Sequence, residues 1–281
     1  MMLLNKIKKY YLTICLHLFL MIFSFFAIIP LLWMISTSFK RLEDVFVYPP
    51  KWIPSPFDFE GYYILFTQIP YGRQFLNSVG VCLIIVIGQL ICSSMGAYAF
   101  AKLRFPGRDK LFILFLATMM VTEIATLIPS YVLMYSLGWI NTYMALIGPF
   151  FLGSAYATFL LRQFIMTIPR ELEESAIIDG AGFFTIYFRI ILPLCKPALA
   201  ALFVFGFCYF WNGFLWPMIV INSDHLKIVN TGIISIAQGY YGLHWPALMA
   251  GATLTVIPLI IIFFAAQRFF VEGITITGIK A

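Results

Sequence analysis

The sequence predicts an all-α membrane protein with six transmembrane helices joined by polar segments. Apolar residues make up 62% of its 281 residues, only 11% are charged, and the mean hydropathy is +0.94, which a water-soluble domain of this length would not tolerate. Apolar runs long enough to cross a bilayer also recur between charged or proline-rich segments. The net charge of +6 does not indicate nucleic-acid binding, because Lys and Arg in a membrane chain mostly mark the loops that stay in the cytoplasm.

The first element is an apolar run at residues 10–36. It is longer than a signal-peptide core of roughly 7 to 15 residues, so we expect an uncleaved first transmembrane helix. Residues 37–76 follow as a predicted extracytoplasmic loop, because the prolines of segment 49–56 exclude a long helix there. One or two short surface helices are expected around residues 60–67. The aromatic residues of this loop indicate a membrane interface more strongly than a partner-binding face.

The second span is predicted at residues 77–103. Within it Ser93, Ala97 and Ala101 stand four residues apart, the small-residue spacing that lets helix backbones approach closely. A cluster of basic residues follows, opposed only by Asp109, and it marks a short cytoplasmic loop. Its members are Lys102, Arg104, Arg108 and Lys110.

The third span, residues 111–133, contains Pro129 and the only carboxylate that we expect inside the lipid, Glu123. An ionisable group at that depth costs at least roughly 2.5 kcal/mol when it faces hydrocarbon, so it should face a partner helix, a pore or an aqueous cavity. Glu123 is then either a substrate or gating contact, or a residue beside a water-filled vestibule where the helix is broken near Pro129. The sequence leaves both interpretations open.

The remaining spans are predicted at residues 143–161, 197–221 and 247–270, with residues 271–281 as a short C-terminal tail. The fifth span contains a polar and aromatic patch formed by Trp211, Asn212 and Trp216. Aromatic rings stack on sugar faces and an amide supplies hydrogen bonds, so these residues and Glu123 are our candidates for a substrate path. An interfacial aromatic belt with a proline-kinked end is the alternative, and it is slightly favoured for Trp216.

The distribution of basic residues tests the orientation independently of hydropathy. With both termini inside, the cytoplasmic segments hold thirteen of the eighteen Lys and Arg residues, and the outer segments hold five. The reverse orientation would invert the positive-inside rule, so we expect both termini in the cytoplasm.

Residues 171–193 interrupt the membrane pattern with a charged segment inside a predicted cytoplasmic loop, residues 164–196. Acidic residues crowd the predicted first turn of a helix, where the helix dipole favours negative charge; they are Glu171, Glu173 and Glu174. Pro169 is expected at the first helical position, with Thr167 or Ile168 as the cap.

Gly180 and Gly182 follow this helix, and both can take the left-handed backbone conformation that ends a helix. Apolar residues at helical spacing then predict a second helix up to Pro193. The segment is therefore predicted as a helix, a glycine turn and a second helix. From spacing alone, an amphipathic hairpin at the membrane surface would explain it equally well.

The segment also resembles the EAA motif of ABC importer permeases, which reads EAA, three residues, Gly, nine residues, Ile, any residue, Leu, Pro. The spacing agrees throughout, with Ser175 as the one departure, in place of the first Ala. Further fragments, SFK, RFPGR, FWNGFLWP, LMAG and QRFFVEG, are similar to sugar-importer permeases of the maltose-permease type, in the smaller of two subunit classes. The resemblance covers essentially the whole chain and implies the ABC importer permease fold.

The resemblance implies a non-catalytic, multi-pass subunit of a bacterial or archaeal plasma membrane, which carries an oligosaccharide or a related polyol or sugar phosphate. The implied partners are a second permease, two cytoplasmic ATP-binding subunits and an extracytoplasmic solute-binding protein. Contact with the ATPase is implied for Glu171, Glu174, Ser175, Ala176, Asp179, Gly180, Ala181, Gly182, Ile190, Leu192 and Pro193. No phosphate-binding GxxxxGK[ST] loop occurs in the chain, so energy from ATP would have to come through another subunit.

Two other classes of function remain as alternatives. A gradient-driven transporter or channel would usually show more spans, internal repeats or several paired charges within the membrane. A membrane-embedded enzyme would need an HExxH motif, paired intramembrane aspartates or a Ser-His arrangement, and none is visible. Neither the histidines nor the five cysteines stand at metal-ligand spacing, so we assign no metal site and no cofactor.

Overall fold

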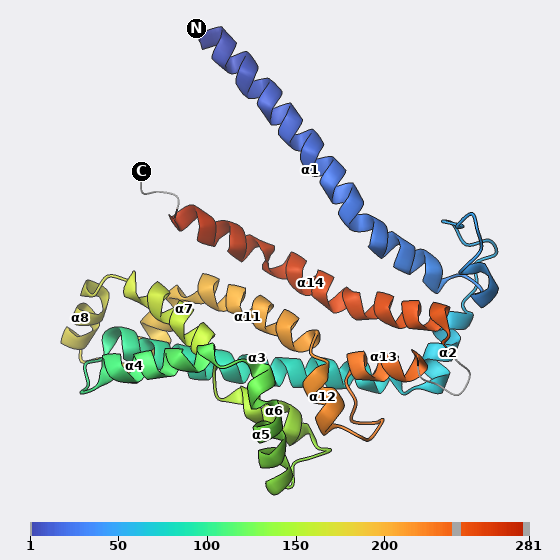
Figure 1. The fold of residues 1–281 in the computed structure, drawn as a ribbon. Helices are drawn as coiled ribbons and strands as arrows, with labels where there is room; N and C mark the ends of the chain where they lie inside the picture. The colour runs from blue at the N-terminus through green and yellow to red at the C-terminus, as the bar shows by residue number, and fades with distance from the viewer. Residues whose placement is uncertain (1, 238–242, 278–281) are drawn as a thin grey trace. The chain divides into compact units, whose positions relative to one another are not determined.

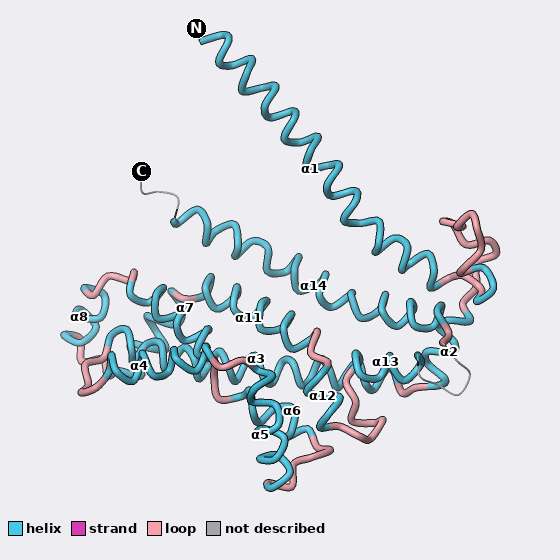
Figure 2. The backbone as a smooth tube through the Cα atoms, in the orientation of Figure 1, coloured by secondary structure: helices cyan, strands magenta, loops and turns pink. Residues whose placement is uncertain are grey.

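The computed structural model describes residues 2–237 and 243–277, and every regular element among them is helical (Figures 1 and 2). The chain forms two compact units. One combines Met1–Tyr71 with Ile233–Val256, and the other combines Gly72–Gly232 with Ile257–Ala281. The predicted all-α class is confirmed.

The first unit contains α1 (Met2–Ser38), the short 3-10 turn η1 (Leu42–Asp44), α2 (Glu60–Gln68) and the first part of α14 (Trp245–Thr277). The short helix expected near residues 60–67 is thus present as α2, but it packs against α14 and is more than a surface helix. A Cβ atom on Gly61 would lie 2.8 Å from the carbonyl of Pro246, and Leu65 is fully buried. Glycine is needed at position 61 because the two backbones meet there.

Lys40, two residues beyond α1, is buried beside an aromatic ring. Its side chain is 2% exposed, its Nζ lies 3.7 Å from the centre of the Trp33 ring, and this atom makes no hydrogen bond within the described part of the chain. Burial lowers the pKa of Lys40 below its usual value, and the nearby charge of Asp44 opposes that shift only in part.

We expect the stability of the protein to rise with pH because of Lys40. Between its lowered folded pKa and the unfolded value of 10.5, the unfolded chain binds more protons than the folded chain, so the free energy of unfolding increases with pH. Thermal unfolding of the purified protein, followed from about pH 8 to about pH 10, measures this dependence. Lys40→Met keeps the side-chain volume without the titrating group and should show a flatter profile. Equal pH dependence in both proteins would contradict the assignment.

The second unit is built around the long helix α3 (Tyr71–Lys102). The shorter elements that follow are α4 (Arg108–Ala117), η2 (Thr118–Met120), α5 (Glu123–Ser136), α6 (Tyr143–Phe151), α7 (Ala155–Met166), α8 (Glu171–Ile178), α9 (Phe183–Ile186), η3 (Tyr187–Ile191), α10 (Leu192–Leu194), α11 (Lys196–Trp211), α12 (Leu215–Val220) and the first turn of α13 (Val229–Ala237), whose later residues belong to the first unit. Because α3 begins at Tyr71, residues 71–76 of the predicted outer loop are helical.

Among the described residues, four helical stretches are long and apolar enough to cross a membrane alone: Tyr10–Ser38, Tyr71–Lys102, Tyr143–Met166 and Trp245–Gln267. Two bent helix pairs bring the number to the six predicted spans if each pair counts as one span. Arg108–Met120 meets Glu123–Ser136 at 98°, and Phe183–Leu194 meets Lys196–Trp211 at 74°.

The third span is therefore broken, and the break lies earlier than the position beside Pro129 that we considered. Val121 and Thr122 adopt extended backbone conformations, and a new helix starts at Glu123, whose carboxylate suits the first turn. Pro129 lies inside α5, where a single missing N–H group is tolerated without ending the helix.

The other span boundaries also need correction. The fourth span continues past residue 161 to Met166, and the fifth ends at Trp211, after which α12 is a separate short helix. The last helix runs on to Thr277, so most of the predicted tail at residues 271–281 is helical, and residues 278–281 lie outside the described part.

Helix α13 was not predicted and lies in what we read as a loop. Its first turn is attached to α3, since the N–H of Val229 donates to Ser78 Oγ at 2.7 Å. Just before it, Asn77 Nδ2 donates to the carbonyls of His225 and Lys227 at 2.9 and 3.0 Å. These contacts, which come from residues about 150 positions away in the sequence, hold the segment in place as a helix.

The small-residue face predicted on the second span is buried, as close packing requires. Ser93, Ala97 and Ala101 are 1%, 0% and 8% exposed. Ser93 Oγ accepts a hydrogen bond from the N–H of Ser154 at 3.0 Å, at the break between α6 and α7. Gly153 at that break has φ +110°, a conformation that side chains other than glycine rarely adopt.

Candidate functional site

Helix α8 carries the acidic half of the EAA-like segment. It begins at Glu171 after Arg170, so the predicted start at Pro169 is wrong by two residues, and Thr167 instead ends α7. Pro169 lies in the short connection between α7 and α8. The predicted crowding of acids in the first turn is confirmed for Glu171, Glu173 and Glu174.

A glycine turn ends α8. Gly180 has φ +80°, its N–H donates to the Ile177 carbonyl at 2.9 Å, and the N–H of Ala181 donates to the Ala176 carbonyl at 2.9 Å. This pair of bonds is the Schellman arrangement, which satisfies carbonyls that the end of a helix leaves without partners. Gly182 does not share the left-handed conformation. Its φ of −76° and ψ of 166° are extended, and it precedes α9.

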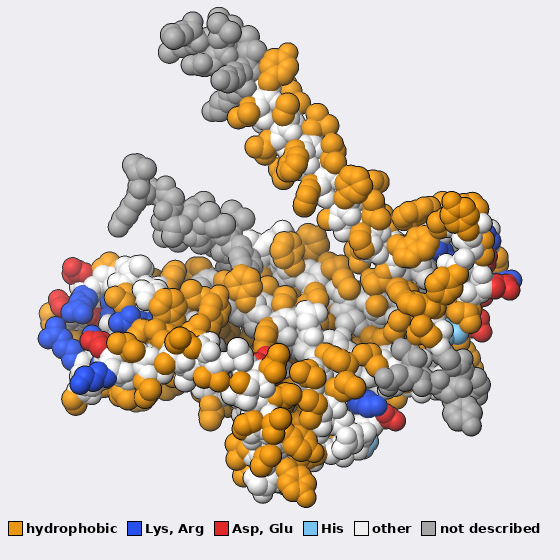
Figure 3. Space-filling view, viewed as in Figure 1, with side chains coloured by type: hydrophobic (Ala, Val, Ile, Leu, Met, Phe, Trp, Pro, Cys, Tyr) orange, Lys and Arg blue, Asp and Glu red, His pale blue; other side chains and the backbone are white. Residues whose placement is uncertain are grey.

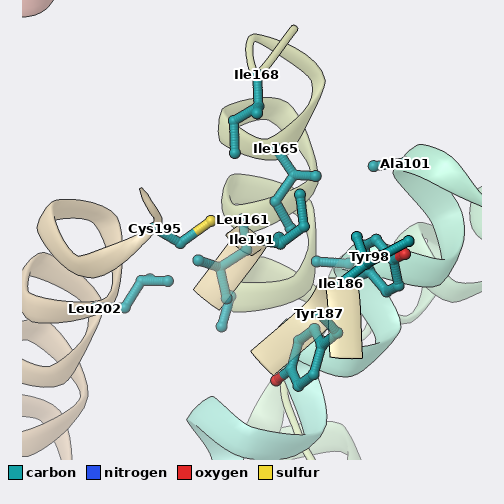
Figure 4. Packing of buried hydrophobic residues seen from close by; sticks show 12 residues of the cluster. Tyr98, Ala101, Leu161, Ile165, Ile168, Ile186, Tyr187, Ile191, Cys195 and Leu202 are labelled. Carbon is teal, nitrogen blue, oxygen red and sulfur yellow. The ribbon is translucent and has the colours of Figure 1, made fainter. Parts of the chain in front are cut away.

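The second arm of the segment, α9 with η3 and α10, packs into the second unit. Ile186, Tyr187 and Ile191 are at most 4% exposed and belong to the same buried cluster as Leu161 and Ile165 of α7 (Figure 4). The arm is also fixed to α3, because the Tyr187 hydroxyl lies 2.6 Å from Ser94 Oγ in a buried hydrogen bond, and its ring lies against the ring of Tyr98.

An ion pair joins the first arm to the end of α3. Lys102 Nζ lies 2.7 Å from Glu173 Oε1 and also donates to the Ile168 carbonyl at 2.8 Å. The side chains are 4% and 13% exposed, so the pair is largely removed from water. Sequence reasoning missed this pair. It read Lys102 only as a marker of a cytoplasmic loop, and no local spacing connects positions 102 and 173.

The motif residues divide into two sets by burial. Ala176, Ala181, Ile190 and Leu192 are partly buried against the cluster around Leu161. The exposed set consists of Glu171, Glu174, Ser175, Asp179, Gly180, Gly182 and Pro193. Charged side chains gather around α8 and α4 in the space-filling view (Figure 3). The same segment also exposes the apolar residues Ile178, Phe183 and Phe184.

A cavity of about 570 Å³ opens beside the break in the third span. Its wall includes Glu123, Asn212 and Trp216, so three of the four candidate path residues come together. Glu123 Oε2 accepts a hydrogen bond from the Tyr209 hydroxyl at 2.6 Å, which spans 86 positions of sequence. Tyr209 lies two residues before Trp211 and was not among our candidates, because its pairing with Glu123 joins two positions that are far apart in the sequence.

Trp211 is the candidate that does not line this cavity. Its indole is 1% exposed and lies between the rings of Phe75 and Phe207, with centroid distances of 5.6 and 5.3 Å. Neighbouring residues of an α-helix point in directions about 100° apart, so Trp211 packs in the interior of the unit while Asn212 faces the cavity. Trp216 is also well packed, with Nε1 donating to the Ala145 carbonyl at 2.9 Å, while its ring still reaches the cavity wall.

A sequence profile described as "Binding-protein-dependent transport system inner membrane component" matches residues 2–276, almost the whole chain. The chain belongs to this family. It is therefore a membrane permease component, and the predicted family is confirmed.

The permease is similar to named relatives along most of its length. It is 35% identical over 260 residues to the arabinooligosaccharides transport system permease protein AraQ of Halalkalibacterium halodurans, covering 92% of each chain. It is 39% identical over 206 residues to the sn-glycerol-3-phosphate transport system permease protein UgpE of Pectobacterium atrosepticum, covering 73% of each.

Solved structures support the fold of the permease. A chain of a bacterial ABC transporter involved in the import of the acidic polysaccharide alginate matches with a TM-score of 0.81 at 23% identity, covering 94% of this chain and 98% of that one. A chain of the MetNI methionine ABC transporter matches with a TM-score of 0.51 at 15% identity, covering 70% and 93%. At these identities the likeness concerns the fold.

Two surfaces of the permease thus have separate chemical capabilities. The α8 turn offers exposed acidic and apolar groups on a rigid, capped helix, which suits contact with another protein. The cavity offers a carboxylate, an amide and aromatic rings, which suit a polar organic solute.

Proposed function

We propose that this permease is one of two membrane subunits of an ATP-driven importer for a saccharide. The second subunit is a different permease, and together the two form the translocation path. Two ATP-binding subunits supply the energy from the cytoplasm, and a solute-binding protein delivers the sugar from outside. The chain itself performs no catalysis.

The observation that carries this proposal is the geometry of the EAA-like segment. Most of its exposed residues lie on α8 and at the left-handed turn at Gly180, and its partly buried residues pack against the buried cluster that includes Leu161 of α7. An ATPase that docks on the exposed set can therefore move the buried arm and, through Tyr187 and Lys102, the end of α3. This continuous packed connection is what a coupling element requires.

The orientation follows from the same assignment. The α8 turn faces the cytoplasm together with both chain termini, and the proline-rich segment before α2 faces outwards, where the binding protein docks. The basic residues around α4 and α8 then lie on the cytoplasmic side, as the positive-inside rule requires. The cavity beside Glu123 forms part of the wall of the sugar path.

We expect uptake by the complete importer to require ATP and not the membrane potential. The importer, reconstituted in vesicles with its ATPase and binding protein, should lose labelled arabino-oligosaccharide uptake when ATP is depleted while a potassium-diffusion potential is maintained. Collapse of the potential with ATP present should leave uptake near its starting rate. Uptake that persists without ATP would instead identify a gradient-driven transporter, for which Glu123 would be the only candidate coupling group that the sequence places in lipid.

A further inference from the structure

The cavity beside α5 carries a negative charge and has no basic side chain in its wall. Among the described residues that line it, Glu123 is the only one with a formally charged side chain. The wall is otherwise formed by apolar and aromatic groups, with Tyr209 and Asn212 as the main polar additions. Figure 3 shows Lys and Arg side chains gathered around α4 and α8, where Arg104, Arg108, Lys110 and Arg170 line a separate pocket.

The polar groups of the wall that remain available are hydrogen-bond acceptors. The Tyr209 hydroxyl donates a hydrogen bond to Glu123 Oε2, and no described group donates one to Oε1. Asn212 Nδ2 donates to the Cys208 carbonyl at 2.7 Å, which turns the amide so that Oδ1 is left without a donor among the described residues. Two free acceptor oxygens fit the hydroxyl groups of a sugar, which donate readily.

The aromatic side of the cavity fits the apolar faces of a sugar ring. Phe150 contacts both Phe210 and Trp216, with ring centroids 5.3 and 6.3 Å apart, and all three line the cavity. A pyranose or furanose ring presents apolar C–H faces to such rings while its hydroxyls point sideways to acceptors. An anionic sugar would bring a second negative charge close to Glu123, and the two like charges would repel each other.

We propose that this cavity selects uncharged saccharides and rejects phosphorylated or uronic-acid sugars, and that Glu123 is the residue that sets this selectivity. Tyr209 is a positioning residue, because its hydroxyl fixes the carboxylate in the wall. The inference rests on the proposed function and narrows its substrate class. Sequence similarity does not make this choice, since the relatives named above include one for an oligosaccharide and one for sn-glycerol-3-phosphate.

The test measures sugar binding directly on the purified permease and ATPase complex, without the binding protein, so that delivery does not contribute to selectivity. Equilibrium dialysis compares labelled arabinotriose with a triuronate of the same length. The wild-type complex should bind the neutral sugar at least about tenfold more tightly, and Glu123→Gln should reduce that preference about tenfold, because it removes the charge and keeps the shape. Tyr209→Phe should reduce the preference for the neutral sugar by a smaller factor than Glu123→Gln does. Glu60→Gln, an exposed acid on α2 outside the cavity, is the matched control and should change nothing.

The outcomes separate this inference from the proposed function. Equal binding of both sugars by the wild type, binding of neither, or an unchanged preference in Glu123→Gln overturns the selectivity assignment, even when ATP-driven uptake is intact. Loss of the preference in Glu123→Gln supports it. If uptake proves independent of ATP while the preference still responds to Glu123, the coupling proposal fails and the cavity assignment stands.

Discussion

Gly180→Trp should abolish transport while the chain still inserts into the membrane and binds its partner permease. Gly180 ends α8 with φ +80°, and a Cβ atom there would meet nothing within 4 Å. A side chain would therefore project from the exposed surface that we assign to the ATPase, and the left-handed backbone would add a strain of about 1 kcal/mol. We expect uptake to fall about 100-fold, since a misplaced interface group removes several kcal/mol of docking energy.

Smaller substitutions at the same turn separate strain from obstruction. Gly180→Asn keeps a residue that tolerates the left-handed conformation and should retain most activity, whereas Gly180→Ala adds the strain with little bulk. Gly182→Ala is the matched control, because Gly182 also faces open space but has an ordinary negative φ. The readout is ATP hydrolysis stimulated by the loaded binding protein in purified complexes. Full stimulation of the Gly180→Trp complex would show that this turn is not the docking surface.

Lys102→Met should destabilise the permease by about 3 kcal/mol, because it leaves Glu173 without its partner in a largely buried position. The Ile168 carbonyl would lose its donor at the same time. Glu173→Leu should lower the stability of the permease by a similar amount. The double variant Lys102→Met with Glu173→Leu should recover most of the loss, since removal of both charges leaves no uncompensated group.

Thermal unfolding of the detergent-purified complex measures these effects. Lys110→Met is the control, because Lys110 is an exposed basic residue close in sequence to Lys102. Its loss should change stability by less than about 0.5 kcal/mol. A double variant that is as unstable as the sum of the two single variants would mean that Lys102 and Glu173 act independently. We also expect the single variants to couple ATP hydrolysis to transport poorly, because α8 is then no longer held to α3.

The features that could be predicted from the sequence are those that short-range chemistry determines. Hydropathy located the spans, because any helix that crosses a bilayer needs a long apolar stretch. The turn at Gly180 was predictable because only glycine adopts that backbone conformation easily. The acids of the first helical turn were predictable from the helix dipole.

The features that could not be predicted depend on contacts between distant residues. The bend before Glu123 arises at Val121 and Thr122, which carry no breaker residue, so a hydropathy window averages across it. Pro129 was the residue in this span from which a helix break could be predicted, but it lies inside the helix α5. The pairs of Glu123 with Tyr209 and of Lys102 with Glu173 join positions far apart in sequence, and only the folded chain brings them together.

The π turn at Tyr187–Ile191 has a consequence for the evolution of the coupling segment. A π turn holds one more residue than the α-helical turn it replaces, and each residue of an α-helix rotates the chain by about 100° about its axis. Because the extra residue is accommodated within one full turn, loss of a single residue there would restore regular α-helix and leave Gly180 and α8 near their present azimuth. A deletion in a regular α-helical stretch would instead rotate the elements beyond it by about 100°, so this turn is the place in the arm where a change of chain length disturbs the coupling surface least.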